Sequence, residues 1–127
     1  MKVFEKEVSY GNPIVSKSYK FAIRIVKFYK YYIDKNRNLE AIFKQLLRSG
    51  TSIGANILKS QSAFTKKDFI YKMGISLKEA RETEYWLKLL HESNIINNYE
   101  YKSLYNDCEE ISKLLTTIIK SAKQKSK

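Results

Sequence analysis

The sequence contains few of the residues that build disulfide, metal or turn-rich frameworks. A single cysteine, Cys108, excludes an intrachain disulfide and a cysteine-based zinc site. The only histidine is His91, and Lys88 stands three positions before it, so the Glu-x-x-His pattern of di-iron helical bundles is absent. One proline and four glycines argue against a turn-rich all-β fold. No run of about 18 apolar residues occurs, so we expect no transmembrane helix.

Catalytic groups are equally scarce. Cys108 falls on the apolar face of the last predicted helix, where a buried structural cysteine is expected. His91 lies near the end of a predicted helix and is better placed to complement the helix dipole than to act as a base. A helical-bundle ribonuclease of the HEPN type needs an arginine five or six residues before its histidine, and Trp86 and Tyr85 stand there. We therefore expect no enzyme activity, no cofactor and no metal.

The charge is strongly unbalanced. Lysine and arginine number 24 against 13 aspartate and glutamate, which gives a formal net charge of +11. Nucleic acid and anionic surfaces are the natural partners of such a chain. The alternative is a lysine-rich solvated surface with no ligand. The first ten residues alternate charged and apolar residues and lack the apolar core of a signal peptide, so we expect a cytoplasmic protein.

The apolar periodicity predicts an all-α fold, a single up-down-up-down antiparallel four-helix bundle. The expected helices cover about 13–35, 39–60, 66–93 and 98–120. Asn12 and Pro13 suit a helix start, Thr65 precedes Asp68 in a near capping box, and Asn97 precedes Glu100 similarly. Residues 1–127 are expected to form one domain, with a polar lead-in at 1–11 and a basic tail at 120–127.

The predicted core face of each helix follows from three- and four-residue spacing. For the first helix that face comprises Tyr19, Ala22, Ile23, Val26, Tyr29 and Ile33. The second contributes Leu39, Ile42, Phe43, Leu46, Ile53 and Ile57. The third contributes Phe69, Met73, Leu77, Ala80 and Leu87. The fourth contributes Leu104, Cys108, Ile111, Leu115, Ile118 and Ile119.

The third helix carries a second apolar stripe on a different face. Because one bundle core needs only one stripe, the second predicts an interaction surface. We expect a homo-oligomer that buries it, with the interface formed by Tyr71, Ile75, Trp86 and Leu89.

Two sequence features break the pattern of a simple bundle. Gly50 and Gly54 lie inside the second helix, where each costs about 1 kcal/mol relative to alanine. Small residues around them allow another backbone to approach closely. That partner is either a neighbouring helix of the same chain or a second subunit.

The second feature is the acidic run from Glu79 to Glu84. By helical angle Glu84 falls within the first stripe, where an unpaired carboxylate would be costly. Arg48 is the predicted partner in a polar pairing layer with Glu79 and Glu84, because arginine binds carboxylates bidentately. Arg48 points away from the apolar face of its own helix, so pairing across a subunit boundary is one arrangement. Ordinary ion pairs with neighbouring lysines and arginines are the other.

Cations also line one side of the first helix. This basic strip comprises Lys17, Lys20, Arg24 and Lys27 and continues through Lys30, and we predict that it contacts RNA or DNA phosphates. A second cluster follows at Lys120, Lys123, Lys125 and Lys127. No base-reading motif occurs, so binding should be electrostatic and weakly specific. A solvated helix face is the simpler alternative.

The motifs Arg48-Ser-Gly-Thr-Ser-Ile-Gly-Ala-Asn56 and Glu82-Thr-Glu-Tyr-Trp-Leu87, with the residues around Asn12-Pro13, resemble a bacterial family. It comprises the four-helix-bundle proteins encoded in intervening sequences of 23S ribosomal RNA genes. The similarity spans about residues 12–119. The family usually places a small residue and glutamate where this chain has Leu58 and Lys59, so this local surface is more basic.

The resemblance implies a small cytoplasmic all-α protein that forms a ring, commonly a pentamer. It also implies kinship with the accessory variability determinant protein of diversity-generating retroelements, a basic bundle that binds nucleic acid and a reverse transcriptase. It carries no catalytic residues. Two functions are therefore expected: a non-enzymatic oligomeric bundle that binds RNA or DNA, or a protein-interaction scaffold with no nucleic-acid role.

Overall fold

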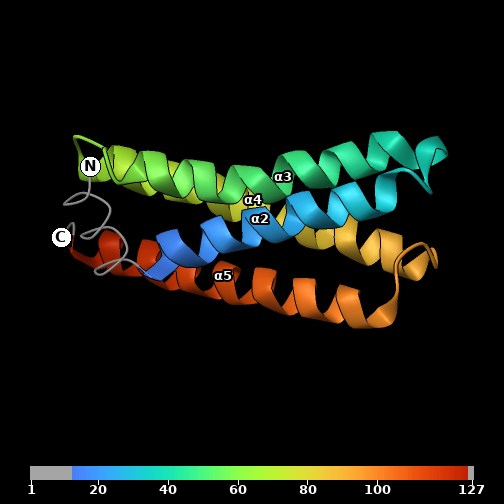
Figure 1. Cartoon of the computed structure of the whole chain (residues 1–127). Helices are drawn as coiled ribbons and strands as arrows, with labels where there is room; N and C mark the ends of the chain where they lie inside the picture. Colours follow the sequence, from blue (N-terminus) through green and yellow to red (C-terminus); the bar gives the residue numbers. More distant parts are fainter. Residues whose placement is uncertain (1–12, 126–127) are drawn as a thin grey trace.

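Four long helices account for nearly all of the chain that the structure describes. The computed structural model describes residues 13–125, with side chains through Gln124. The helices are α2 (Pro13–Ile33), α3 (Glu40–Ser60), α4 (Lys66–Glu92) and α5 (Asn98–Lys125), and a 3-10 turn, η1 (Arg37–Leu39), precedes α3. Successive helices run in opposite directions (Figure 1). The predicted all-α four-helix bundle is thus confirmed, although α5 ends five residues later than expected.

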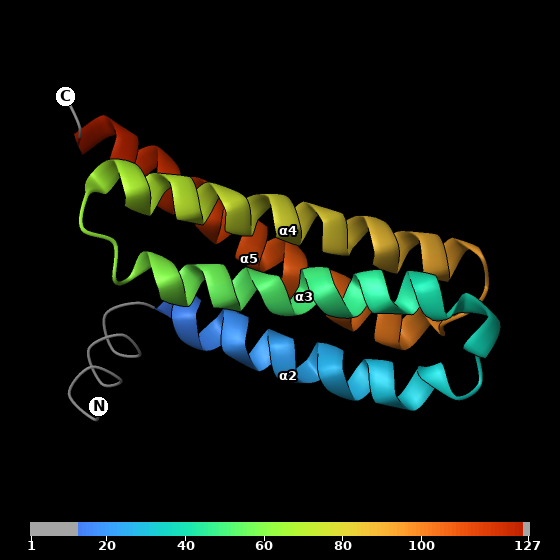
Figure 2. The same ribbon diagram turned by 90° about the horizontal axis from the view of Figure 1, so that it is seen from above.

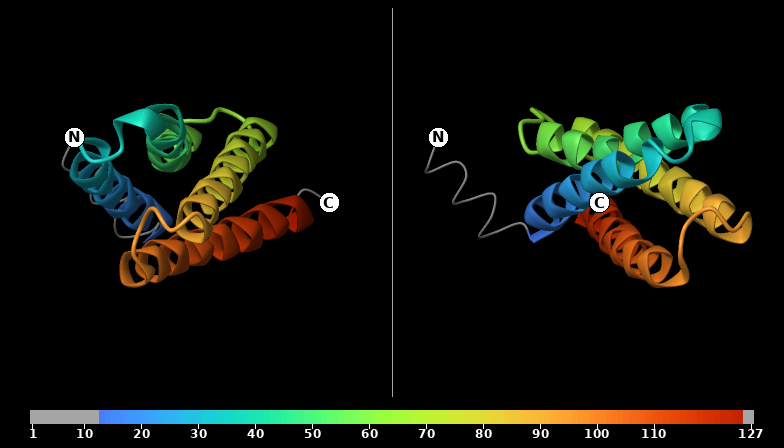
Figure 3. Two further views of the ribbon diagram at one scale, coloured as in Figure 1. Left: turned by 90° about the vertical axis from the view of Figure 1, so that its right-hand side faces the viewer. Right: turned by 45° about the vertical axis from the view of Figure 1, so that its right-hand side comes forward.

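The helices pack in the order in which they occur. Each helix contacts its neighbour along the chain, and α2 contacts α5 to close the bundle. Viewed from above, α2 and α3 lie side by side along most of their length (Figure 2). The end view shows α4 and α5 diverging from the loop that joins them (Figure 3). The two helices are therefore farther apart where α4 begins and α5 ends.

Side-chain caps define two of the helix starts. The Thr65 hydroxyl accepts a hydrogen bond from the Asp68 backbone N–H at 3.0 Å, as the capping pattern predicted. The Asn97 side chain accepts from the Glu100 N–H at 2.8 Å, and its own amide donates to Glu100 at 2.8 Å. The predicted cap at Asn12 lies outside the described residues.

The α4 helix ends in a left-handed turn. Asn94 has a φ of 60°, and the Ile95 N–H donates to the Leu90 carbonyl at 3.0 Å across it. Asparagine tolerates this conformation better than other side-chain-bearing residues. The chain thereby reverses within a few residues and starts α5.

The buried residues confirm the predicted core faces of α3, α4 and α5 and correct the predicted face of α2. Phe43, Met73, Leu87 and Cys108 are among the buried residues on α3, α4 and α5. On α2, Ile33 is buried as predicted and Ala22 and Tyr29 are half-buried, whereas Tyr19, Ile23 and Val26 are exposed. The other buried side chains of this helix were not predicted: Ile14, Phe21, Ile25, Phe28 and Tyr32. The α2 sequence carries two overlapping apolar stripes, and the one with more aromatic residues is buried because it removes more apolar area from water.

The glycines of α3 mark a close crossing with α2 inside one chain. A Cβ at Gly50 would lie 2.9 Å from both Cγ atoms of Ile25, and a Cβ at Gly54 would lie 3.2 Å from the Ser18 backbone oxygen. Real Cβ atoms do not approach neighbours as closely as the first distance. Of the two arrangements left open by the sequence, the structure shows the intramolecular one.

Candidate interaction surfaces

The polar features of α3 and α4 converge on Arg48. Its Nη1 donates to both carboxylate oxygens of Glu79, at 3.0 and 3.2 Å, and its Nη2 donates to Glu82. Its Nε donates to Gln45 at 3.1 Å, which orients the guanidinium. This Arg48 cluster connects α3 to α4 within a single chain, so it needs no partner across a subunit boundary.

The cluster extends to the only tryptophan. The Trp86 indole N–H donates to Glu82 at 3.0 Å, so Glu82 joins Trp86 to Arg48. The pKa of Glu82 is lowered from its usual value, first by the Trp86 hydrogen bond and then by the Arg48 guanidinium. Glu82 was not among the residues predicted for the pairing layer, although the repeat of glutamate at 79 and 82 was a usable signal for it.

Glu84 occupies a different place from the one predicted. It lies on the α5 side of α4, where the Ser112 hydroxyl donates to its Oε2 at 2.7 Å. Successive α-helical residues are about 100° apart, so Glu84 and Glu82 face different neighbours. The prediction that Glu84 shares a layer with Arg48 is therefore wrong, because α5 rather than α3 lies opposite it.

The basic strip faces acidic side chains of α5. Lys17 pairs with Glu110 at 3.1 Å, and Arg24 contacts Asp107 at 2.5 Å and Ser103 at 2.8 Å. Within residues 13–124 no carboxylate lies within ion-pair distance of the other members, Lys20, Lys27 and Lys30. The structure thus divides the predicted phosphate-binding residues into paired and uncompensated groups.

Two apolar surfaces remain uncovered on the described chain. The α4 apolar surface is the predicted interface of Tyr71, Ile75, Trp86 and Leu89: Tyr71 is 66% exposed, and the other three are partly buried. The α2 apolar surface comprises Tyr19, Ile23 and Val26, which are 67%, 38% and 50% exposed. Sequence reasoning missed the second surface because it assigned this stripe to the core.

The chemistry-bearing side chains do not assemble into a catalytic site in the described region. Cys108 is fully buried, its Sγ lies 3.3 Å from the Ala80 carbonyl, and burial raises the pKa of its thiol. His91 stacks on Tyr101 at 4.0 Å between ring centroids and contacts Asn98 at 3.0 Å. Among the described residues, no three His, Cys, Asp or Glu side chains are grouped to hold a metal. Nor is any described helix long and apolar enough to cross a membrane.

The fold and these surfaces define a basic four-helix-bundle protein with a partly exposed arginine–glutamate cluster that joins α3 to α4 within one chain. The family model of the 23S rRNA-intervening sequence proteins matches residues 12–117, and the chain belongs to that family. A solved structure, a protein of unknown function from the S23 ribosomal protein family of Bacteroides thetaiotaomicron VPI-5482, is 50% identical. The match covers 84% of this chain and 98% of that one, with a TM-score of 0.81. No match was found among curated proteins.

Proposed function

We propose that this chain is a non-enzymatic bundle that self-associates and binds RNA or DNA electrostatically with weak sequence specificity. The observation that carries the proposal is the excess of cations that the fold leaves uncompensated. Of the basic strip, Lys20, Lys27 and Lys30 lack an acidic partner within residues 13–124. With a net charge of +11, such lysines attract a polyanion by releasing its counterions.

The two apolar surfaces support self-association. An exposed tyrosine with an aliphatic neighbour occurs on both α2 and α4, and patches of this kind mark protein contacts. The surfaces differ, so we propose that the α2 apolar surface of one copy covers the α4 apolar surface of the next. A head-to-tail contact of this type generates a ring when its rotation closes. The family resemblance suggests five copies.

Self-association is tested with one substitution on each surface. Val26→Glu and Tyr71→Glu should each reduce the oligomer to monomers in light scattering at micromolar concentration. An equimolar mixture should recover a dimer, because each variant retains the surface that the other lacks. Tyr99→Glu, at an exposed tyrosine outside both surfaces, is the control. A wild-type monomer, or a mixture that stays monomeric, contradicts the head-to-tail contact.

Nucleic-acid binding is tested by titrating a fluorescent single-stranded oligonucleotide. The affinity should fall steeply with salt, with a slope of about −0.7 per phosphate contact. The alternative function is a protein-interaction scaffold, which the partly exposed Trp86 favours because tryptophan is enriched at interfaces. Oligomers that show no salt-sensitive binding would support that scaffold instead.

A further inference from the structure

The two ends of the bundle differ in charge. The end where α3 stops, α4 starts and α5 stops includes residues 57–72 and 113–124. Its cations are Lys59, Lys66, Lys67, Lys72, Lys113, Lys120 and Lys123. The single acid in these ranges, Asp68, pairs with Lys72 at 2.8 Å, and Lys113 lies 4.0 Å from Glu109 just outside them. The opposite end, residues 28–44 and 85–102, mixes six cations with the four acids Asp34, Glu40, Glu92 and Glu100. The uncompensated charge is therefore concentrated at the first end.

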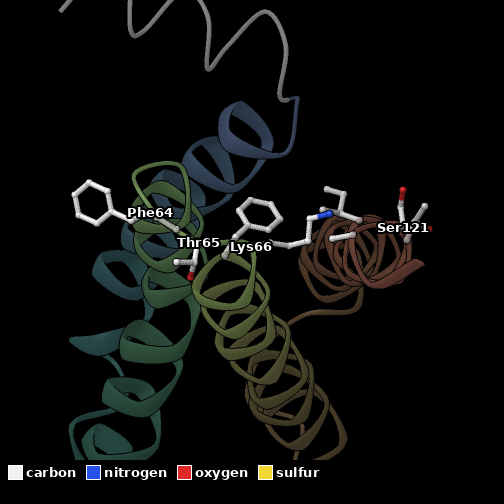
Figure 4. Close-up of a pocket in the computed structure, with 9 residues that line it drawn as sticks. Phe64, Thr65, Lys66 and Ser121 are labelled. Atoms are coloured by element: carbon white, nitrogen blue, oxygen red, sulfur yellow. The ribbon is translucent and has the colours of Figure 1, made fainter. Parts of the chain in front are cut away.

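One aromatic side chain at the same end is fully exposed to solvent. Phe64, in the loop between α3 and α4, has a relative exposure of 102%, higher than that of any other large apolar residue described. Figure 4 shows its ring projecting away from α5, while the Lys66 side chain reaches toward α5 and Ser121. Beside them is a surface pocket of about 600 Å³ between the diverging ends of α4 and α5, lined in part by Phe69, Thr117 and Ile118. Exposing a whole phenyl ring brings the folded chain no stability.

Charge and aromatic exposure together specify the chemistry of a partner. It must be anionic at several points and must offer flat apolar groups between them. A single-stranded nucleic acid has both features, because its phosphates pair with lysines and its bases stack on aromatic rings. An anionic membrane is less suitable, since surface binding needs a continuous apolar face rather than one ring.

We propose that the α3–α4 end of the bundle is the main binding site for single-stranded RNA or DNA, with a base stacked on Phe64 and phosphates on Lys66 and Lys67. This assignment rests on the proposed nucleic-acid function, and it places the main binding site at the bundle end instead of on the basic strip. The strip has two of its cations engaged with Glu110 and Asp107. Lys66 and Lys67, in contrast, have no carboxylate within ion-pair distance among residues 13–124.

The charge test compares two variants that change the net charge equally. Lys66→Glu with Lys67→Glu alters the end, and Lys20→Glu with Lys27→Glu alters the strip. Acidic residues in the first turn of α4 favour the helix, so the end variant should fold, as circular dichroism will show. Binding of a labelled oligo(dT) of about 20 nucleotides at about 50 mM salt should weaken at least tenfold in the end variant and less than threefold in the strip variant.

The stacking test uses aromatic residues at opposite ends. Phe64→Ala should weaken oligo(dT) binding about tenfold, because a stacked base contributes roughly that much. Tyr99→Ala, which removes an 83% exposed ring from the mixed-charge end, should change it little. With an abasic oligomer of equal length, Phe64→Ala should have no effect.

The outcomes separate the two proposals. Wild-type protein that fails to bind oligo(dT) overturns the nucleic-acid function and this site with it. Binding that weakens equally in both charge variants, or more in the strip variant, overturns the site and leaves the function standing. A third outcome favours a lipid surface and overturns the site. In that outcome Phe64→Ala reduces sedimentation with phosphatidylserine vesicles but leaves oligo(dT) binding unchanged.

Discussion

Gly50 of α3 lies directly against the side chain of Ile25 of α2, both in the buried core. The absence of a Cβ at this position is what lets the two helices approach. Gly74 of α4 is the opposite case, because a Cβ there would meet no atom within 4 Å. Two glycines within helices thus have different physical roles, and substitution distinguishes them.

We expect Gly50→Ala to destabilise the protein and Gly74→Ala to stabilise it. At Gly50 the methyl group forces a β-branched core residue to move, at a cost of about 1–3 kcal/mol that exceeds the gain in helix propensity. At Gly74 only the propensity gain of about 1 kcal/mol remains. Urea unfolding followed by circular dichroism measures both. A stabilising Gly50→Ala would contradict the close crossing.

We expect replacement of Arg48 by lysine to lower the stability of the protein. A lysine has one ammonium group and cannot donate to Glu79 and Glu82 in the forked geometry of the guanidinium. Because these side chains are partly exposed, we expect Arg48→Ala to cost only about 1 kcal/mol, with Arg48→Lys between it and the wild type. The unfolding free energy of the three proteins is the measurement. Equal values for arginine and lysine would show that the bridging geometry contributes nothing.

The hydroxyl of Tyr32 should make stability depend on alkaline pH. It donates to Glu100 at 2.6 Å, and burial, followed by this bond, raises the pKa of Tyr32 to about 12 from an ordinary 10.0. A raised folded-state pKa means that the contribution is complete below pH 10.0 and is lost as the pH rises through about 12. Tyr32→Phe should therefore be less stable than wild type by about 1–2 kcal/mol at neutral pH.

The difference in unfolding free energy between wild type and Tyr32→Phe should shrink once the pH exceeds 10.0. Above that pH the Tyr32 phenol ionises in the unfolded wild-type chain but not yet in the folded one, which stabilises the unfolded state. Lysine deprotonation affects both proteins alike, so the difference between them isolates Tyr32. Paired urea titrations across this pH range provide the measurement. A constant difference would contradict the shift.

Cys108 should be inert in the folded protein. Its side chain is completely buried, and only the exposed thiolate reacts with disulfide reagents. Ellman's reagent should show no reaction under native conditions and one thiol in denaturant. Rapid labelling of the native protein would mean that α5 opens readily.

Most of the fold could be predicted from local features of the sequence. Thr65 and Asn97 place two helix starts through their own capping hydrogen bonds, and the apolar spacing on α3, α4 and α5 indicates the buried faces. On α2, periodicity alone could not choose between two stripes. The choice depended on which side chains fit against α3, where Ile25 packs on Gly50 and the rings of Phe28 and Tyr32 stack with Phe43.

The candidate surfaces were less accessible to sequence reasoning. Arg48 could be matched with acidic residues of the third helix, but whether Glu82 or Glu84 was its partner depended on the rotation of α4 about its axis. Likewise Lys17 and Lys20 look equivalent in the sequence. Only the approach of α5 pairs the first with Glu110.

The sequence by itself determined the helical architecture, the net charge and the family, because helix periodicity, caps and composition are properties of neighbouring residues. The tertiary structure decided which stripe of α2 is buried, which lysines remain uncompensated and that Phe64 stands exposed among them. These depend on how the helices are rotated and spaced, and residues distant in the chain set that geometry together.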